Sequence, residues 1–320
     1  MRPSITCAPV KRAIESFLKT ESMTSRDFIL PSFFGDSLAL GLHWIYDAAR
    51  IAALHPDGIQ SYDDPRSSYH PGKSAGDLTH LGDQMLLLLE SLAAGGGSIV
   101  GWPRDWRAWA ERIRDDGSSY LDGATRGTLG NFAVGRSQPS ASSDLAGAAR
   151  IAPLFAVHDK VEALVASARV QTSLTHGDSR VIDAAEFFAR TAFSVGVGAG
   201  FREAFEEASS QRYDALPADE WFGLALRAGG DLPTAAAALG LGCDIEGAFP
   251  LTLALALRHE GNPVAALSAN AMLGGDSAAR GLLLGLLLGA RHGIDAFPDS
   301  WTSRLRGIDR INGALERLGS

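Results

Sequence analysis

The sequence predicts an all-α fold, and three observations carry that prediction. Several segments are rich in leucine and almost free of β-branched residues, which favours helix over strand; the most pronounced are 84–94, 247–258 and 281–290. No stretch of strand length alternates valine or isoleucine with polar residues. The chain also lacks the regular succession of strand and helix patterns that a parallel sheet requires.

Helical periodicity places further elements along the chain. We expect helices over 10–20, 36–54, 84–94, 105–114, 144–157, 161–170, 180–195, 202–210, 218–228, 247–258 and 281–290. Segments 56–76 and 130–143 are rich in Pro, Ser and Gly and predict loops. Neither loop has the character of a domain linker, because the helices on both sides of it still need other helices to cover their apolar faces. We therefore expect an N-terminal extension over 1–26 and a single domain over 27–320.

Composition and charge exclude several classes of protein. Of the 320 residues, 46% are hydrophobic and 21% charged, which is typical of a folded soluble chain. The apolar run at 281–290 is too short to cross a bilayer, and the N-terminus lacks a signal-peptide core, so we expect a cytoplasmic protein without a membrane partner. A formal charge of -8 argues against broad nucleic-acid binding. Cys7 and Cys243 lie far apart in the sequence and form no metal or redox spacing.

Four polar segments adjoin apolar helical stretches in the sequence and are the candidates for a functional site: 35–47, 76–91, 174–178 and 274–280. Each puts acids, hydroxyls or histidines at or near a helix start, where free N–H groups and the helix dipole favour anions. Each also has a structural explanation. Asp276 is a good N-cap that Arg280 can pair with, and Asp83 can simply open a helix.

Six motifs together resemble the ADP-ribosylglycohydrolase superfamily, with the crystallin-J1-like branch as the nearer relatives. They are FFGDSLALGLHW from Phe33, THLGDQMLLLLESL from Thr79, DGAT from Asp122, SSDLAGAARIAPL from Ser142, LTHGD from Leu174 and GGDSAARGLLLGLLLGA from Gly274. The resemblance covers residues 28–292. It implies an orthogonal multi-helix bundle with a central cleft that holds two divalent metals, magnesium or manganese. Such proteins cleave the bond between ADP-ribose and a protein side chain, or related N- and O-glycosidic bonds.

Several positions depart from the family pattern. Where family hydrolases carry Thr-Asp-Asp-Thr, this chain has Thr79, His80, Leu81 and Gly82 before Asp83, and Ala278 stands in place of the second acid of the C-terminal motif. The glutamate expected seven residues after Asp36 is His43. Hard cations need several anionic ligands, so we expect one ion rather than two, and the histidines shift the preference toward manganese or zinc.

The resemblance assigns roles to the remaining polar residues. We expect Asp36, His43 and Asp83 to be catalytic, with His43 as a possible general base. The predicted metal ligands are Thr79, His80, Asp83 and Asp276. The predicted substrate-binding residues are Asp122, Gly123, Asp144, His176, Ser277 and Arg280.

The sequence thus favours a hydrolase of ADP-ribosyl or similar glycosidic substrates with an altered metal site. Two alternatives stay open because acids are missing: a protein that binds ADP-ribose without cleaving it, and a structural, crystallin-like protein. Two measurements separate these three functions: the hydrolase cleaves ADP-ribose conjugates, the binding protein binds ADP-ribose without cleavage, and the structural protein does neither. The bond that is cleaved and the oligomeric state are not specified by the sequence.

Overall fold

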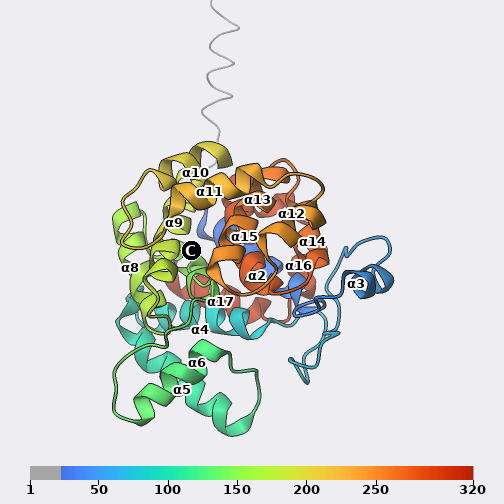
Figure 1. The fold of residues 1–320 in the computed structure, drawn as a ribbon. Helices are drawn as coiled ribbons and strands as arrows, with labels where there is room; N and C mark the ends of the chain where they lie inside the picture. The colour runs from blue at the N-terminus through green and yellow to red at the C-terminus, as the bar shows by residue number, and fades with distance from the viewer. Residues whose placement is uncertain (1–22, 320) are drawn as a thin grey trace, which may run out of the picture.

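The computed structural model describes residues 23–319, and these residues fold as an all-α protein with only isolated β-bridges, as predicted (Figure 1). The predicted helix at 10–20 lies outside the described residues. The α-helices are α2 (Ser25–Leu40), α3 (Ala48–Leu54), α4 (His80–Ala94), α5 (Trp102–Asp116), α6 (Gly123–Ala133), α7 (Ala146–Ala149), α8 (Val161–Ser173), α9 (Ser179–Gly196), α10 (Phe201–Ser209), α11 (Ala218–Arg227), α12 (Leu232–Leu239), α13 (Ile245–Arg258), α14 (Pro263–Leu273), α15 (Ser277–His292), α16 (Asp299–Arg304) and α17 (Ile308–Leu318). Short 3-10 helices span Ile99–Gly101 (η1), Ala152–Ala156 (η2) and Ile294–Ala296 (η3).

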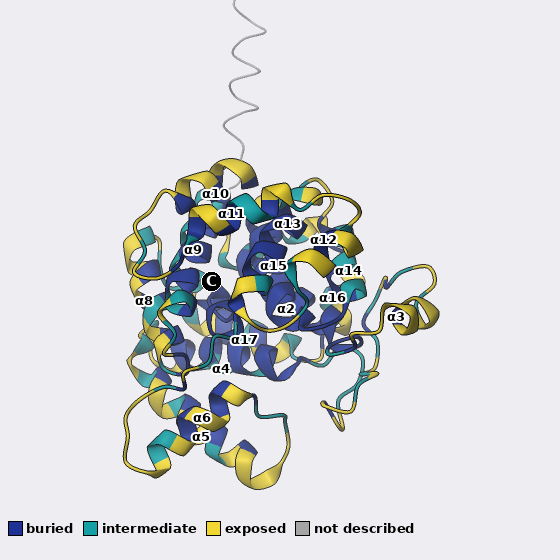
Figure 2. Cartoon of the chain, in the orientation of Figure 1, coloured by how far each residue is buried: buried dark blue, intermediate teal, exposed yellow. Residues whose placement is uncertain are grey.

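Helices α2 and α15 form the centre of the molecule, and both are buried along nearly their whole length (Figure 2). The glycines of α15 at 281, 285 and 289 face α2. A Cβ on any of them would overlap a backbone oxygen of α2, namely those of Gly35, Pro31 and Asp27. The spacing of four residues between these glycines therefore lets α2 approach closely. It brings the start of α15 against the end of α2, where the polar motifs lie.

Buried apolar side chains from Phe28 to Leu315 form one continuous cluster around this pair of helices. Its continuity supports our proposal of a single domain over 27–320. No helix among the described residues is long and apolar enough to cross a membrane, in agreement with the sequence.

Two of the predicted helices are wrong in their bounds. The segment 36–54 is not one helix: α2 begins at Ser25, opened by a capping box between Thr24 and Asp27, and ends at Leu40, so Asp36 lies inside it. The segment 144–157 is divided into α7 and η2, and Pro153 opens the second piece. Helices α6, α12, α14, α16 and α17 were not predicted, and α6 takes the first four residues of the expected loop at 130–143.

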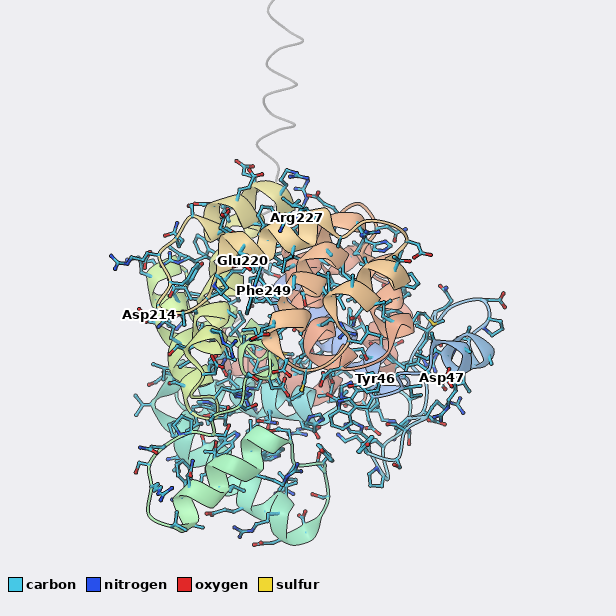
Figure 3. All side chains as sticks on the ribbon, in the orientation of Figure 1. Tyr46, Asp47, Asp214, Glu220, Arg227 and Phe249 are labelled. Carbon is cyan, nitrogen blue, oxygen red and sulfur yellow. The ribbon has the colours of Figure 1, made fainter. Side chains whose placement is uncertain are left out.

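The predicted loop at 56–76 is confirmed, and it forms, together with α3, a projection from the body of the molecule (Figure 1). Tyr46 and Asp47 mark the point where the chain leaves the body (Figure 3). The loop returns to the body, where Arg66 N donates to Gly41 O at 2.9 Å. Its last part then carries His70 and Lys73 against the start of α4, next to the predicted site.

Candidate functional site

The start of α15 and the turn after α2 are joined by reciprocal backbone hydrogen bonds. Trp44 N donates to Gly275 O, and Gly275 N donates to Ile45 O, both at 2.8 Å. Gly275 has a φ of 60°, which glycine adopts at little cost. Trp44 itself has a φ of 62°, and it is the only described non-glycine residue with a positive φ. Such strain is characteristic of functional sites when the surrounding structure holds it in place.

The strained turn aims the Trp44 indole at the predicted metal ligand Asp276. Trp44 Nε1 donates to Asp276 Oδ2 at 3.1 Å. Asp276 holds the N-cap position of α15, as predicted, but its side chain makes no capping hydrogen bond. Its other oxygen, Oδ1, is buried without any partner. The carboxylate therefore points into the site and not along the helix.

Asp36 joins α2 to the start of α4. Its Oδ2 accepts from Thr79 N at 2.7 Å and its Oδ1 accepts from Thr79 Oγ1 at 2.5 Å. Burial raises the pKa of Asp36 to about 7, even though these hydrogen bonds oppose the shift. Thr79 Oγ1 in turn caps α4 by accepting from Leu81 N and Gly82 N. Because both carboxylate oxygens are used and the residue is fully buried, the geometry favours a positioning role for Asp36 over the predicted catalytic one.

Three histidines lie together beside Trp44. The predicted residues His43 and His80 are joined by His70, and the ring centroids lie 5.3 to 5.9 Å apart. His70 Nε2 and His80 Nδ1 share a hydrogen bond of 3.1 Å. Burial lowers the pKa of His70 to about 3 and that of His80 to about 4. The cluster is therefore neutral at physiological pH.

His43 is held in one tautomer. Its Nδ1 accepts a hydrogen bond from Ala278 N at 3.3 Å, so the proton of the neutral ring lies on Nε2. Burial, together with His70 and Arg280, keeps the pKa of His43 well below its usual value. Its Nε2 is buried without a partner. This geometry favours a neutral hydrogen-bond donor over the predicted general base.

Asp83 faces a lysine. Lys73 Nζ donates to Asp83 Oδ2 and to Leu78 O, each at 2.6 Å, and Ser119 Oγ donates to the same carboxylate oxygen at 3.0 Å. The Lys73 ammonium group thus occupies the position at this carboxylate that a metal ion would take. Together with Ala278 in place of a second acid, the pairing leaves too few free oxygen ligands for a magnesium pair. The donor set at the start of α4 does not fit the metal centre that the family resemblance implies.

Asp122 and His176 lie at the two ends of a series of hydrogen-bonded, buried side chains. Asp122 caps α6 by accepting from Thr125 N at 2.6 Å, and it also accepts from Gln84 Nε2 at 2.9 Å. Gln84 then accepts from Arg150, which donates onward to Thr175 Oγ1 at 2.7 Å. Against the effect of burial, His80 and the Thr125 N–H hold the pKa of Asp122 below its usual value. Asp122 is therefore an ionised carboxylate inside the molecule.

The hydroxyl of Thr175 continues the chain to the predicted residue His176. Thr175 Oγ1, which accepts from Arg150, shares a hydrogen bond of 2.9 Å with His176 Nδ1. The other ring nitrogen, Nε2, is buried without a partner. Burial and the neighbouring Arg150 lower the pKa of His176 to about 3, so the ring is neutral. His176 and His43 thus each have a buried Nε2 without a hydrogen-bond partner.

The other predicted substrate-binding residues lie at helix starts. Gly123 is the first residue of α6, with open space where a side chain would stand. Ser277 opens α15, and its buried Oγ has no partner. Arg280 is fully buried and donates to Asn270 Oδ1 at 3.1 Å and to Gly274 O at 2.6 Å. These bonds tie Arg280 to the loop before α15, and no ion pair with Asp276 is formed, so the geometry favours a structural role.

Among the described residues, Asp144, Cys243 and Asp276 form a group of three ligand-type side chains. One carboxylate oxygen from each aspartate and the Cys243 Sγ all lie within 4.8 Å of one another. Burial raises the pKa of both aspartates, with their mutual repulsion adding to the shift of Asp144, which is well above its usual value. Two carboxyl groups this close titrate as a pair, and the raised pKa values favour the protonated form. No metal-ligand spacing around Cys243 is visible in the sequence, because its neighbours in space come from distant segments.

Hollows border the polar centre on two sides. One, with a volume of about 450 Å³, is lined by Tyr69 and Tyr120, whose rings contact Trp44 at centroid distances of 4.7 and 4.9 Å. The other, of about 440 Å³, is lined by Ser140 and Gly177, next to His176.

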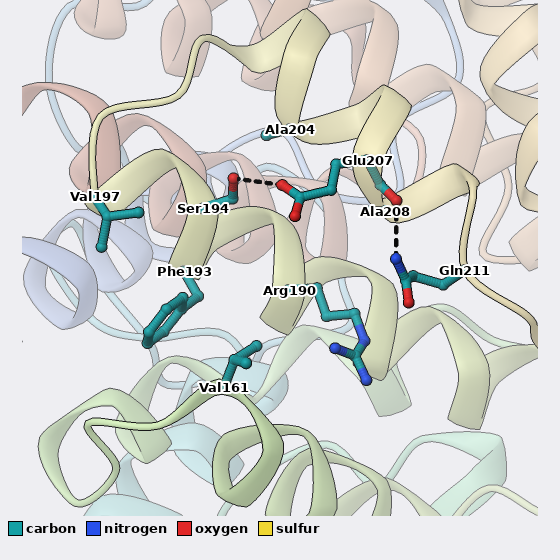
Figure 4. A pocket seen from close by; sticks show the side chains of 9 residues that line it. All are labelled: Val161, Arg190, Phe193, Ser194, Val197, Ala204, Glu207, Ala208 and Gln211. Carbon is teal, nitrogen blue, oxygen red and sulfur yellow. Dashed lines mark hydrogen bonds between the residues drawn. The ribbon is translucent and has the colours of Figure 1, made fainter.

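A cavity between α8, α9 and α10 lies outside this region (Figure 4). Its volume is about 210 Å³, and its polar groups are already paired. Ser194 Oγ donates to Glu207 Oε2 at 2.9 Å, and Arg190 donates to Glu186 and Glu162. With no free acid or orphaned donor, this cavity is a weaker candidate for chemistry than the polar centre.

Sequence reasoning missed several residues of the site. His70 and Lys73 come from a loop without a motif, and Cys243 is separated from Asp144 and Asp276 along the chain. Arg150 was available as a signal, because an arginine inside an apolar segment such as LAGAARIAPL has to find buried partners. The predicted residues Asp36, His43, Thr79, His80 and Asp276 do come together, whereas Asp83 is turned toward Lys73 and Ser119.

The chain matches known proteins by sequence family and by fold. The family model described as ADP-ribosylglycohydrolase matches residues 25–320. Among solved structures, the chain is similar to one titled "ADP-ribosylglycohydrolase-related protein complex", with a TM-score of 0.60 and 20% sequence identity over 92% of this chain and 97% of that chain. At this identity the likeness shows the fold. A search of curated proteins finds no match.

Proposed function

Because the chain belongs to the ADP-ribosylglycohydrolase family, we propose that it hydrolyses a glycosidic bond of an ADP-ribosyl or closely related N- or O-linked substrate. The observation that carries the proposal is the close pair of acids Asp144 and Asp276, of which Asp276 is buried, together with nearby buried polar groups that lack a hydrogen-bond partner. The pair takes the central role that the sequence assigned to Asp36, His43 and Asp83.

The acid pair suits glycosidic cleavage for an electrostatic reason. The transition state resembles an oxocarbenium ion, so nearby negative charge stabilises it. Two carboxyl groups that share one proton supply an acid to protonate the leaving group and a carboxylate to activate water. Asp122, whose charge contributes to the raised pKa of Asp144, adds to the negative field. Protonation of the leaving group takes this proton from the pair, and deprotonation of water returns one, so the pair ends the reaction with the number of protons it began with.

The neutral histidines serve a different purpose in this proposal. His43 Nε2–H is a buried donor without an acceptor, and His176 Nε2 is also buried without a partner; such groups are costly unless a ligand satisfies them. Ribose hydroxyls and phosphate oxygens are suitable acceptors. We assign to both histidines the binding and orientation of the substrate, with Gly123 and Ser277 at the nearby helix starts leaving room for it.

Turnover of defined conjugates tests the proposal. Wild-type protein is incubated with ADP-ribosylated arginine, serine and DNA, with and without Mg²⁺, Mn²⁺ and Zn²⁺, and released ADP-ribose is measured. Asp276→Asn and Asp144→Asn should each lower the rate by at least ~100-fold, the usual effect of removing an acid or base. Asp47→Asn is the matched control: this residue is exposed and caps α3, and asparagine caps equally well.

Two outcomes contradict the proposal. The first is the absence of ADP-ribose release by the wild-type protein from every conjugate. The second is undiminished release by the Asp276→Asn and Asp144→Asn variants, because then another group carries the reaction.

A second function is favoured by one observation. Lys73 neutralises Asp83, and alanine stands at position 278 in place of an acid, which are the changes expected when catalysis is lost and the cleft kept. The protein would then bind ADP-ribose without cleaving its conjugates. Calorimetry with ADP-ribose, together with the turnover assay, separates the two functions, because binding without release supports only the second.

A further inference from the structure

We propose that Asp144, Cys243 and Asp276 form a site for a single divalent cation of the thiophilic class, to which Zn²⁺ belongs. The site differs in ligands from the centre that the family resemblance implies, because it uses a thiol and Asp144 and leaves Thr79, His80 and Asp83 out.

The geometry matches a three-ligand site. A tetrahedral ion with bonds of about 2.0 to 2.3 Å holds its ligand atoms about 3.3 to 3.8 Å apart. The two carboxylate oxygens and the Cys243 Sγ already lie within 4.8 Å of one another, so side-chain adjustments suffice to close the site. Three protein ligands and one water form the arrangement usual for catalytic zinc. Cys243 is open to solvent, which gives the ion a route inward.

The backbone around the three residues is held in place. Leu145 N donates to Cys243 O at 3.0 Å, and Ile245 N donates to Ser143 O at 2.9 Å, so the chain segments of Asp144 and Cys243 are paired. Asp276 N donates to Leu241 O at 2.8 Å and attaches the third segment. A site whose backbone is fixed before binding loses little entropy when the ion arrives.

An orphaned carboxylate oxygen is the independent sign of a ligand. Asp276 is only 3% exposed, and its Oδ1 has no hydrogen-bond partner, while Oδ2 is held by Trp44. Neither aspartate forms an ion pair with a described Lys, Arg or His side chain, in contrast to Asp83, which pairs with Lys73.

The donor chemistry selects the kind of ion. A thiolate with two carboxylates suits a borderline or soft cation, whereas Mg²⁺ requires an octahedral shell of oxygen ligands. An ion bound by both carboxylates takes the place of the proton that the Asp144–Asp276 pair would otherwise hold. Its catalytic use rests on the proposed function: in the ion-bound protein the bound water, whose pKa Zn²⁺ lowers to about 7, would take over the activation of water from the carboxylate. Binding itself needs no substrate and can be tested separately.

The experiment uses Co²⁺ as a spectroscopic substitute for Zn²⁺ on the full chain carrying Cys7→Ser, which leaves Cys243 as the single cysteine. Chelator-treated protein is titrated with Co²⁺, and absorption is recorded. We expect one equivalent to bind with a thiolate-to-cobalt charge-transfer band, and one equivalent of Zn²⁺ to abolish it. Mg²⁺ in large excess should leave the band unchanged.

Variants then test the ligands one by one. In the Cys7→Ser background, Cys243→Ser should remove the charge-transfer band, and Asp144→Asn should weaken Co²⁺ binding by at least ~100-fold, since loss of even an indirect partner of a metal site costs 10- to 100-fold. Asp47→Asn is again the control and should bind as the parent does. Cys243 is at the surface, so its serine variant is expected to fold, and circular dichroism checks this.

The inference is overturned if the Cys7→Ser protein shows no charge-transfer band with Co²⁺, or if Cys243→Ser binds Zn²⁺ as tightly as its parent. Either result is independent of turnover. Ion binding without any ADP-ribose release would leave this site standing and remove only the proposed hydrolysis.

Discussion

Replacing Asp36 by asparagine should make the fold less sensitive to rising pH. Asp36 is fully buried and its pKa is raised to about 7 from a usual value of 3.8, so the folded chain keeps the carboxyl proton where the unfolded chain loses it. The stability from this group is therefore complete below the unfolded value and is lost as the pH rises through about 7. Each unit of difference between the folded and unfolded pKa changes the free energy of unfolding by about 1.4 kcal/mol. The shift of Asp36 from 3.8 to about 7 therefore corresponds to about 4 kcal/mol.

Asparagine carries no charge and can keep both contacts, accepting from Thr79 N and donating to Thr79 Oγ1. Urea unfolding of both proteins between about pH 4 and about pH 8 measures the difference. The variant should gain up to about 4 kcal/mol over the wild type across that range, since other titrating groups are common to both. Two stability curves that stay parallel across the range would refute the assignment of Asp36 as a buried, proton-bearing link between α2 and α4.

Three further perturbations test the packing and the site. Gly285→Ala should destabilise the fold by about 1 to 3 kcal/mol in thermal unfolding, because the added Cβ overlaps Pro31 O. The control Gly130→Ala, at an open position of α6, should stabilise the fold by about 0.5 to 1 kcal/mol. Equal effects of the two variants would contradict the close contact between α2 and α15. Trp44→Phe removes the donor to Asp276 and should cost about 1 to 3 kcal/mol by denaturant unfolding, and an unchanged midpoint would argue against that bond. Mg²⁺ should leave the melting temperature unchanged, because Lys73 already neutralises Asp83 at the start of α4. A melting temperature that rises with Mg²⁺ concentration would instead indicate the magnesium centre that the family resemblance implies.

The fold class could be predicted from the sequence because helices such as α4, α13 and α15 are rich in leucine and almost free of β-branched residues. The glycines four apart in α15 allow the close contact that α2 makes with it. The start of α2 could not be read in the same way, because Pro31 and Gly35 lower helix propensity inside it. Only burial against α15 makes this segment helical, and a single sequence does not show that contact.

The candidate site was predictable in part for a similar reason. Motifs identify residues at the ends of helices, such as Thr79 and Asp276, because local capping and charge patterns mark them. Partners that arrive from loops carry no such pattern. Lys73 changes the role of Asp83, and Cys243 completes a group with Asp144, yet both pairings depend on the path of loops through space.

A crystal structure of the protein with ADP-ribose tests the central claim most directly. The account predicts that the terminal ribose lies against the carboxylates of Asp144 and Asp276, with His43 Nε2 or His176 Nε2 donating to its oxygens. ADP-ribose bound away from these carboxylates, for example in the cavity between α8, α9 and α10, would contradict it.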